Sequence, residues 1–118
     1  MGANPVVSTP ELQIDTEKTQ TETVFRCAGK ITSSTSSLLQ STVRRVLPEK
    51  KTIVLDLSKV TYMDSSGLGA LVSVWVSAKR GGCQLKLVSI SERVKELLRL
   101  TNLDKLFAAS RFPDTPSF

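Results

Sequence analysis

Hydrophobic and polar residues divide the chain into short segments with the spacing of strands and helices. Apolar and polar residues partly alternate over residues 11–18, which predicts a first strand. Residues 23–28 predict a second strand that ends at Gly29. The polar residues 19–22 between them are turn-like. The two strands are therefore expected to form a hairpin.

A first helix is predicted over residues 34–47, where apolar residues recur at helical spacing. It follows the serine- and threonine-rich run 32–37, whose hydroxyls can accept hydrogen bonds from the free N–H groups of a helix start. Pro48 lacks an N–H donor and is expected to stop the helix.

Strands and helices alternate in the rest of the chain. The segment before the second helix is short, β-branched and almost continuously apolar, as expected for a central strand covered on both faces. Gly81-Gly82 should end the second helix, because glycine tolerates left-handed backbone angles. These later elements are a strand at 52–57, a loop at 58–63, a helix at 68–80, a strand at 84–88 and a helix capped by Ser91 and running to about Leu100.

The order of elements predicts a single α/β domain, a mixed β-sheet of about four to five strands with helices packed mainly on one face. A chain of 118 residues has room for one such domain. We expect a flexible leader at 1–10, the domain at 11–111 and a tail at 112–118. Within the domain, a short helical turn is expected at 102–107, followed by a final strand at 108–111.

Composition excludes several classes of function. The chain has no histidine, which removes the commonest general base and metal ligand. Cys27 and Cys83 are too few for a metal cluster and are interpreted as buried thiols, so no cofactor or metal is expected. No apolar run approaches the roughly 20 residues that cross a bilayer, and no signal peptide is evident. We therefore expect a cytoplasmic protein that does not bind membranes. The net charge of +5 is spread without a dense basic run, which does not favour nucleic-acid binding.

The most informative segment is the turn Asp64-Ser65-Ser66-Gly67, which precedes the second predicted helix. It places two hydroxyls and a carboxylate where a helix has free N–H groups and a positive dipole end, so the site favours an anion. A phosphate on Ser65 would change the local charge sharply. Gly67 and Gly69 are expected to leave the backbone uncovered for a partner. An ordinary alternative makes Asp64 and Ser65 simple caps and the glycines turn residues.

Residues 52–69, followed by Gly81-Gly82 and residues 91–106, resemble the STAS domain of bacterial anti-anti-sigma factors, also called anti-sigma factor antagonists. The resemblance covers about residues 11–111. It implies a binding protein and not an enzyme, with Ser65 as the phosphorylated residue. It also implies that the unphosphorylated form binds an anti-sigma factor, a serine kinase with a GHKL-type ATPase fold, and so releases a sigma factor. A phosphoserine phosphatase would restore binding. The residues expected to contact the partner are Thr32, Met63, Asp64, Ser66, Gly67 and Leu68.

One position departs from the family pattern. Where such proteins commonly carry an acidic residue and then an aspartate, this chain has Lys30, Ile31 and Thr32. Lys30 is either a plain exposed turn residue or a residue that selects the partner, and Thr32 can replace the carboxylate as a hydrogen-bonding group. Alternative functions are an accessory subunit of a signalling assembly or transporter, or an enzyme with Ser65 as nucleophile. The enzyme is disfavoured because the chain offers no histidine base.

Overall fold

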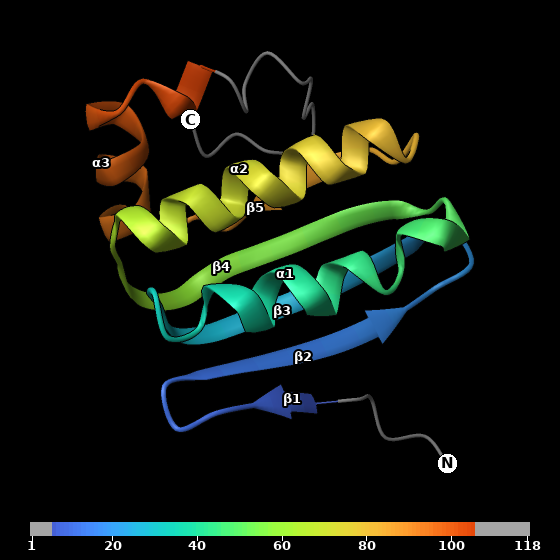
Figure 1. Cartoon of the computed structure of the whole chain (residues 1–118), viewed down its shortest axis with the longest axis horizontal. Coiled ribbons are helices and arrows are strands. Elements are labelled where there is room, and N and C mark those ends of the chain that lie inside the picture. Colours follow the sequence, from blue (N-terminus) through green and yellow to red (C-terminus); the bar gives the residue numbers. More distant parts are fainter. Residues whose placement is uncertain (1–5, 106–118) are drawn as a thin grey trace.

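The computed structural model describes residues 6–105, which form one mixed sheet with helices packed against it (Figure 1). The five strands lie in sequence order, β1-β2-β3-β4-β5. β1, β2 and β3 pair antiparallel, whereas β3, β4 and β5 pair parallel. The predicted mixed α/β sheet is confirmed. The strands are β1 (Val6–Ser8), β2 (Leu12–Lys18), β3 (Glu22–Ile31), β4 (Thr52–Met63) and β5 (Leu85–Val88).

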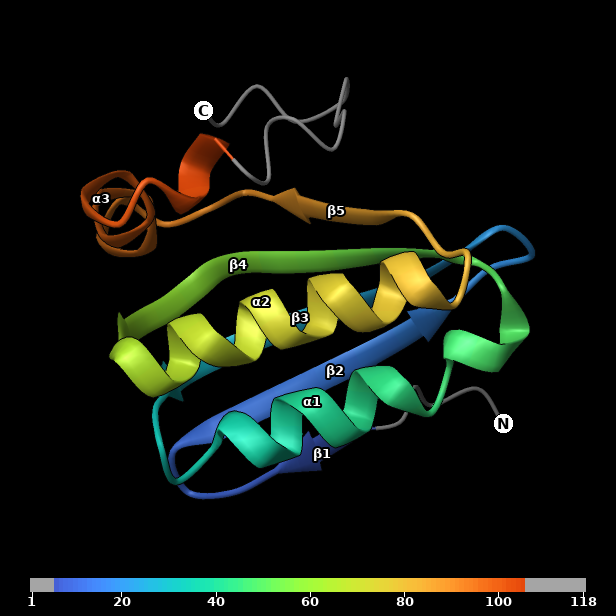
Figure 2. The same ribbon diagram turned by 45° about the horizontal axis from the view of Figure 1, so that its top comes forward.

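α1 and α2 occupy the connections between the parallel strands, and α3 follows β5. α1 and α2 lie side by side across one face of the sheet (Figures 1 and 2). α3 lies at the end of the molecule where α2 begins, and it packs against β4. The bounds are α1 (Ser36–Arg44), the 3-10 turn η1 (Leu47–Glu49), α2 (Ser65–Arg80) and α3 (Glu92–Leu100).

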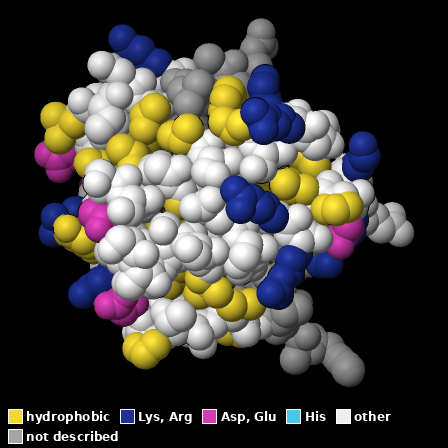
Figure 3. Space-filling model, in the orientation of Figure 1, with side chains coloured by type: hydrophobic (Ala, Val, Ile, Leu, Met, Phe, Trp, Pro, Cys, Tyr) yellow, Lys and Arg dark blue, Asp and Glu magenta, His cyan; other side chains and the backbone are white. Residues whose placement is uncertain are grey.

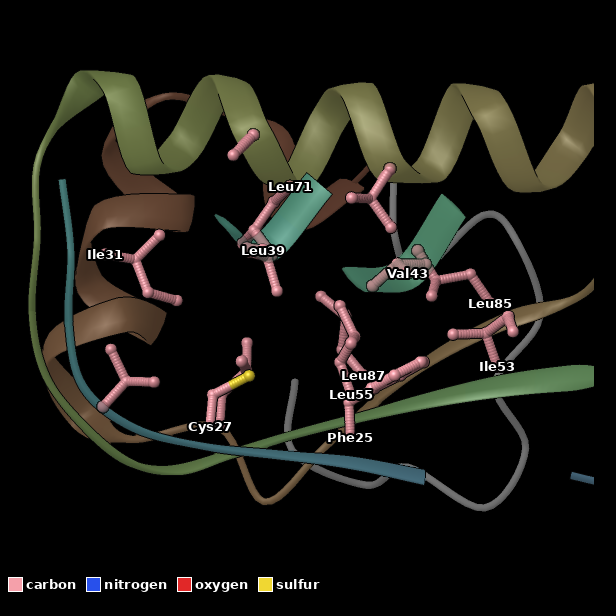
Figure 4. Close-up of a cluster of buried hydrophobic side chains, with 14 of the residues drawn as sticks. Phe25, Cys27, Ile31, Leu39, Val43, Ile53, Leu55, Leu71, Leu85 and Leu87 are labelled. Carbon is pink, nitrogen blue, oxygen red and sulfur yellow. The ribbon is translucent and has the colours of Figure 1, made fainter. Parts of the chain in front are cut away.

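The main core lies between α1, α2 and the sheet (Figure 4). Leu39 and Val43 of α1 and Leu71 of α2 meet Phe25 of β3 and Leu55 of β4, and all five are buried. Each buried leucine or phenylalanine side chain contributes about 1.5–3 kcal/mol relative to an exposed one. This core fixes the position of α2, whose first residues form the candidate site.

β3 and β4 are both longer than the sequence predicts. β3 does not end at Gly29 but continues to Ile31, because a register shift after Gly29 lets the strand resume. Gly29 has φ of +118°, and a side chain there would collide with the carbonyl oxygen of Glu11. β4 includes the predicted loop 58–63. Its buried positions there recur every third residue, so the strand shows no alternation in the sequence.

Two other expectations about the N-terminal half were wrong. Residues 6–8, assigned to a flexible leader, form β1 and pair with β2. α1 begins at Ser36, and its N-cap Thr35 makes no side-chain cap. The Thr35 hydroxyl donates to the carbonyl of Lys30 at 2.8 Å and accepts from the N–H of Thr32 at 2.9 Å. Hydroxyls of this run therefore close the β3–α1 loop instead of capping the helix.

α2 begins three residues earlier than predicted. Ala70, Leu71, Val74 and Ala78 are buried, whereas the larger side chains of Val72, Trp75 and Val76 are half-buried. Small alanines on this face allow the helix to lie close to the sheet. Gly82 follows the helix with φ of +78°, as predicted. α3 is capped as predicted, because the Ser91 hydroxyl accepts from the N–H of Val94.

Both cysteines are buried free thiols, as predicted. Burial, with a smaller contribution from the charge of Asp56, raises the pKa of the Cys27 thiol to about 12. Over residues 6–105, no helix is long and apolar enough to span a membrane, and no group of three or more His, Cys, Asp or Glu side chains could hold a metal ion. Residues 103–105 are helical, and the rest of the predicted turn 102–107, the strand 108–111 and the tail 112–118 lie outside the described residues.

Candidate functional site

The candidate site lies at the edge of the sheet where β3 and β4 end together. In the parallel pairing of these strands, Ile31 is opposite Met63. Neighbouring strands are about 4.8 Å apart, so the residues that follow, Thr32 and Asp64, leave the sheet at adjacent positions. Residues that are 32 positions apart in the sequence are thereby brought to one edge.

Asp64 starts α2 as its N-cap. Its backbone is extended, and its Oδ1 accepts a hydrogen bond from the N–H of Gly67 at 3.0 Å. The N–H of Asp64 points toward the carbonyl of Ile31 at 3.4 Å, which ties the cap to the end of β3. Ser65 is the first residue of the helix, and both Ser65 and Ser66 are exposed. The structure therefore supports the capping role of Asp64 and leaves the two hydroxyls on the surface.

Gly67 holds the start of α2 against β3. A Cβ atom at this position would collide with the carbonyl oxygen of Ile31 and lie 2.8 Å from Cγ of Met63. The expectation that Gly67 keeps the backbone open to a partner is wrong, because the missing side chain faces the inside of the domain. Gly69 fits that expectation, since nothing lies within 4 Å of a Cβ placed there.

The other expected contact residues differ in exposure. Met63 and Leu68 each expose only 7% of their surface, so they form the floor beneath the helix start. Thr32 is half-buried, and its hydroxyl lies 3.0 Å from the hydroxyl of Ser34 and accepts from the N–H of Ser34 at 3.3 Å. Lys30 is exposed. A partner approaching this edge would meet Ser65, Ser66, Gly69 and Lys30 before it met Met63 or Leu68.

The arrangement suits a group whose charge can be changed by modification. The first N–H groups of a helix have no acceptor within the helix, and the dipole of α2 is positive at Ser65. The Asp64 carboxylate lies one residue away and is held by the N–H of Gly67. A phosphate on Ser65 would thus project into solvent from a position with both attractive N–H groups and a neighbouring negative charge.

Sequence reasoning missed an apolar feature beside this site. Tyr62 and Leu100 are exposed by 45% and 76%, although both are large hydrophobic residues. Leu100 does not belong to the buried stripe of α3, in which Val94 and Leu98 face the core. A leucine outside the core-facing stripe of an amphipathic helix is the signal that could have indicated a contact surface.

Asp64→Ala is expected to lower the free energy of unfolding by about 1 kcal/mol, because the N–H of Gly67 loses its acceptor. Asp64→Asn keeps a side-chain oxygen at the cap and is the matched control, expected to lose less than half of that amount. Urea denaturation of the three proteins measures the difference. Equal losses in both variants would mean that the negative charge, and not the hydrogen bond, stabilises the helix start.

The STAS domain family matches residues 13–116 of the chain, which includes the whole of this site. The chain belongs to the STAS domain family. The resemblance inferred from the sequence is thereby confirmed. The STAS domain is 27% identical over 99 residues to the anti-sigma-B factor antagonist of Bacillus subtilis, covering 84% of this chain and 91% of that protein. It is 35% identical over 81 residues to the anti-sigma-B factor antagonist of Listeria monocytogenes, covering 67% and 70%.

Solved structures agree with this assignment. An anti-sigma factor antagonist from Mycobacterium paratuberculosis superposes with a TM-score of 0.70 at 25% identity, covering 86% of this chain and 87% of that one. The unphosphorylated and phosphorylated forms of SpoIIAA give TM-scores of 0.65 and 0.61. Their coverage is 76% and 78% of this chain and 81% and 86% of theirs. Both are 18% identical, so they show the shared fold alone.

Some relatives carry this domain as a small part of a larger protein. The sulfate transporter YvdB of Bacillus subtilis, itself a putative assignment, is 35% identical over 86 residues. The alignment covers 73% of this chain but only 16% of YvdB. The first relatives named above, in contrast, match over most of their own length.

Proposed function

We propose that this STAS domain protein is an anti-sigma factor antagonist that phosphorylation switches off. In its unphosphorylated form it binds an anti-sigma factor, and the bound anti-sigma factor releases its sigma factor. The anti-sigma factor is a serine kinase of the GHKL type that phosphorylates Ser65, and a phosphoserine phosphatase reverses the modification. The protein acts by binding and performs no chemistry of its own.

One observation carries the proposal: Ser65 is exposed and is the first residue of α2, at the edge where β3 and β4 end. The anti-sigma-B factor antagonist of Bacillus subtilis aligns over 84% of the chain. An exposed hydroxyl at a helix entrance can enter the active site of a kinase without unfolding of the domain. The same hydroxyl lies at the centre of the surface that a partner would cover.

Phosphorylation would end binding through charge and bulk. A phosphoserine carries about −1.5 to −2 charges at neutral pH, added here directly beside the carboxylate of Asp64. A docking surface that is complementary to the neutral Ser65 would face this charge without compensation. Nothing lies within 4 Å of a Cβ at Gly69, so a partner can approach this turn of α2 closely. Ser65 is four residues earlier on the same face of the helix, and a phosphate there would obstruct the approach.

Incubation with the anti-sigma factor kinase and ATP is expected to add one phosphate to the wild-type chain. The Ser65→Ala variant is expected to receive none. Ser66→Ala is the matched control, because Ser66 is also exposed and directly follows Ser65. It should accept one phosphate as the wild type does. Intact mass spectrometry counts the phosphates, and peptide mapping locates them.

Full phosphorylation of Ser65→Ala would place the modified residue elsewhere and contradict the assignment. Loss of modification in both variants would implicate the pair of hydroxyls and not Ser65 by itself. The purified anti-sigma factor kinases of the source genome, tested one at a time, provide the enzyme.

A second candidate function is favoured by the match to YvdB. In that case the domain would be a non-catalytic accessory subunit of a transporter or signalling assembly. Such a subunit should stay bound to its assembly whether or not Ser65 is phosphorylated. Co-sedimentation of the wild-type and Ser65→Asp proteins with membrane fractions separates the two functions.

A further inference from the structure

A groove lies between the end of β4 and α3, next to the start of α2. Its volume is about 140 Å³, and Tyr62 and Leu100 form its exposed apolar rim. Figure 3 shows hydrophobic side chains gathered at the end of the molecule where α3 lies. The groove is lined by Tyr62, Met63, Arg93, Glu96, Leu97 and Leu100.

This groove lies next to the candidate site. Met63 lines the groove and packs beneath the first turn of α2, on the inner side of Gly67. Met63 also precedes Ser65 by two residues, so their Cα atoms are within about 8 Å of each other. A partner that covers Ser65 would therefore reach the groove.

A stable interface requires more buried area than the start of α2 can supply. A specific complex buries about 800 Å² of each partner, equivalent to a disc of about 16 Å radius. Its affinity comes mainly from a few large side chains in desolvated pockets. The exposed start of α2 offers the hydroxyls of Ser65 and Ser66 and the bare backbone of Gly69, and none of these is an apolar anchor.

The described residues expose three large hydrophobic side chains, those of Val6, Tyr62 and Leu100. Two of the three line this one groove, while Val6 lies on β1 at the opposite edge of the sheet. The lining of the groove also includes one charge of each sign, Arg93 and Glu96. It therefore selects for a neutral apolar group with polar surroundings, and not for a strongly charged ligand.

We propose that the groove between β4 and α3 binds an apolar side chain of the anti-sigma factor, and that it supplies the affinity that phosphorylation of Ser65 switches off. This inference rests on the proposed function, and it assigns Tyr62 and Leu100 as anchor residues. The serine provides control of binding, whereas the groove provides much of its strength.

The test compares Leu100→Gln with Val6→Thr in the 118-residue chain. Both remove an exposed apolar side chain, glutamine is a good helix former and threonine suits a strand, so both variants should fold. Leu100→Gln is expected to raise the Kd for the purified anti-sigma factor kinase by about tenfold or more, the effect of losing an anchor residue. Val6→Thr should stay within about twofold of the wild type, a change below 0.5 kcal/mol. Isothermal titration calorimetry gives both values, and urea denaturation confirms that both variants are folded.

Each outcome separates the two proposals. If Ser65→Asp loses binding but Leu100→Gln binds as tightly as Val6→Thr, the groove is not an anchor site and the switch survives. If the wild type binds none of the purified kinases, both proposals fall. Light scattering adds a further outcome: a wild-type dimer that Leu100→Gln converts to a monomer would assign the groove to a second copy of this chain and overturn the proposal.

Discussion

Ser65→Asp is expected to weaken binding to the anti-sigma factor by about 100-fold or more, a change of about 2.7 kcal/mol. The substitution places a permanent negative charge at the exposed first residue of α2, beside Asp64. An uncompensated charge in an interface costs several kcal/mol because it must be desolvated next to groups arranged for a neutral hydroxyl. Ser65→Ala removes the site of modification without adding charge. It should bind within about threefold of the wild type, or about 0.7 kcal/mol.

A matched control places the same charge elsewhere on the helical layer. Ser41 is an exposed serine of α1, more than one turn beyond the start of that helix. Ser41→Asp makes the same change in net charge as Ser65→Asp and should leave the Kd unchanged. Equal binding by Ser65→Asp and Ser65→Ala would exclude a charge switch at this position. Equal weakening by Ser41→Asp would point to a general effect of net charge.

The second large effect is expected for the fold itself. Gly67→Ala should lower the free energy of unfolding by about 3 kcal/mol, the upper part of the range for overpacking a close contact. The new Cβ would collide with the carbonyl oxygen of Ile31. Because this oxygen belongs to the backbone of β3, the collision can be relieved only if α2 moves away from β3. The separation would also displace Asp64 and Ser65, so binding of the anti-sigma factor should fall along with stability.

Gly69→Ala provides the contrast within the same helix. A Cβ there meets nothing within 4 Å, so alanine should raise the free energy of unfolding by about 0.5–1 kcal/mol through helix propensity alone. Urea denaturation of both variants gives the two differences. A stable Gly67→Ala protein would show that α2 does not pack against the end of β3 as closely as the structure has it. Weaker partner binding by Gly69→Ala, despite its higher stability, would identify Gly69 as a point of contact.

Local sequence patterns predicted the order of most elements and the capped turn before the second helix. The apolar spacing of the segments that became β2, β4, α2 and α3 reflects which side chains face the core, and this information is local. The motif from Asp64 to Gly67 likewise contains its own helix cap, because the carboxylate and the N–H that it accepts from are three residues apart. The position of Ser65 at a helix start thus followed from the sequence, whereas its exposure is known only from the structure.

Contacts between distant segments decided the rest. Gly29 was expected to end a strand, but β3 continues because the chain at Glu11 pairs with it and permits a bulge. Gly67 was interpreted as an open position, although the carbonyl of Ile31 fills the space beside it. The groove joins Tyr62 of β4 to Leu100 of α3, two residues that no local pattern connects. Periodicity records whether a residue is buried, but not what buries it. The sequence therefore located the helix start that carries Ser65, and only tertiary packing placed an apolar groove beside it.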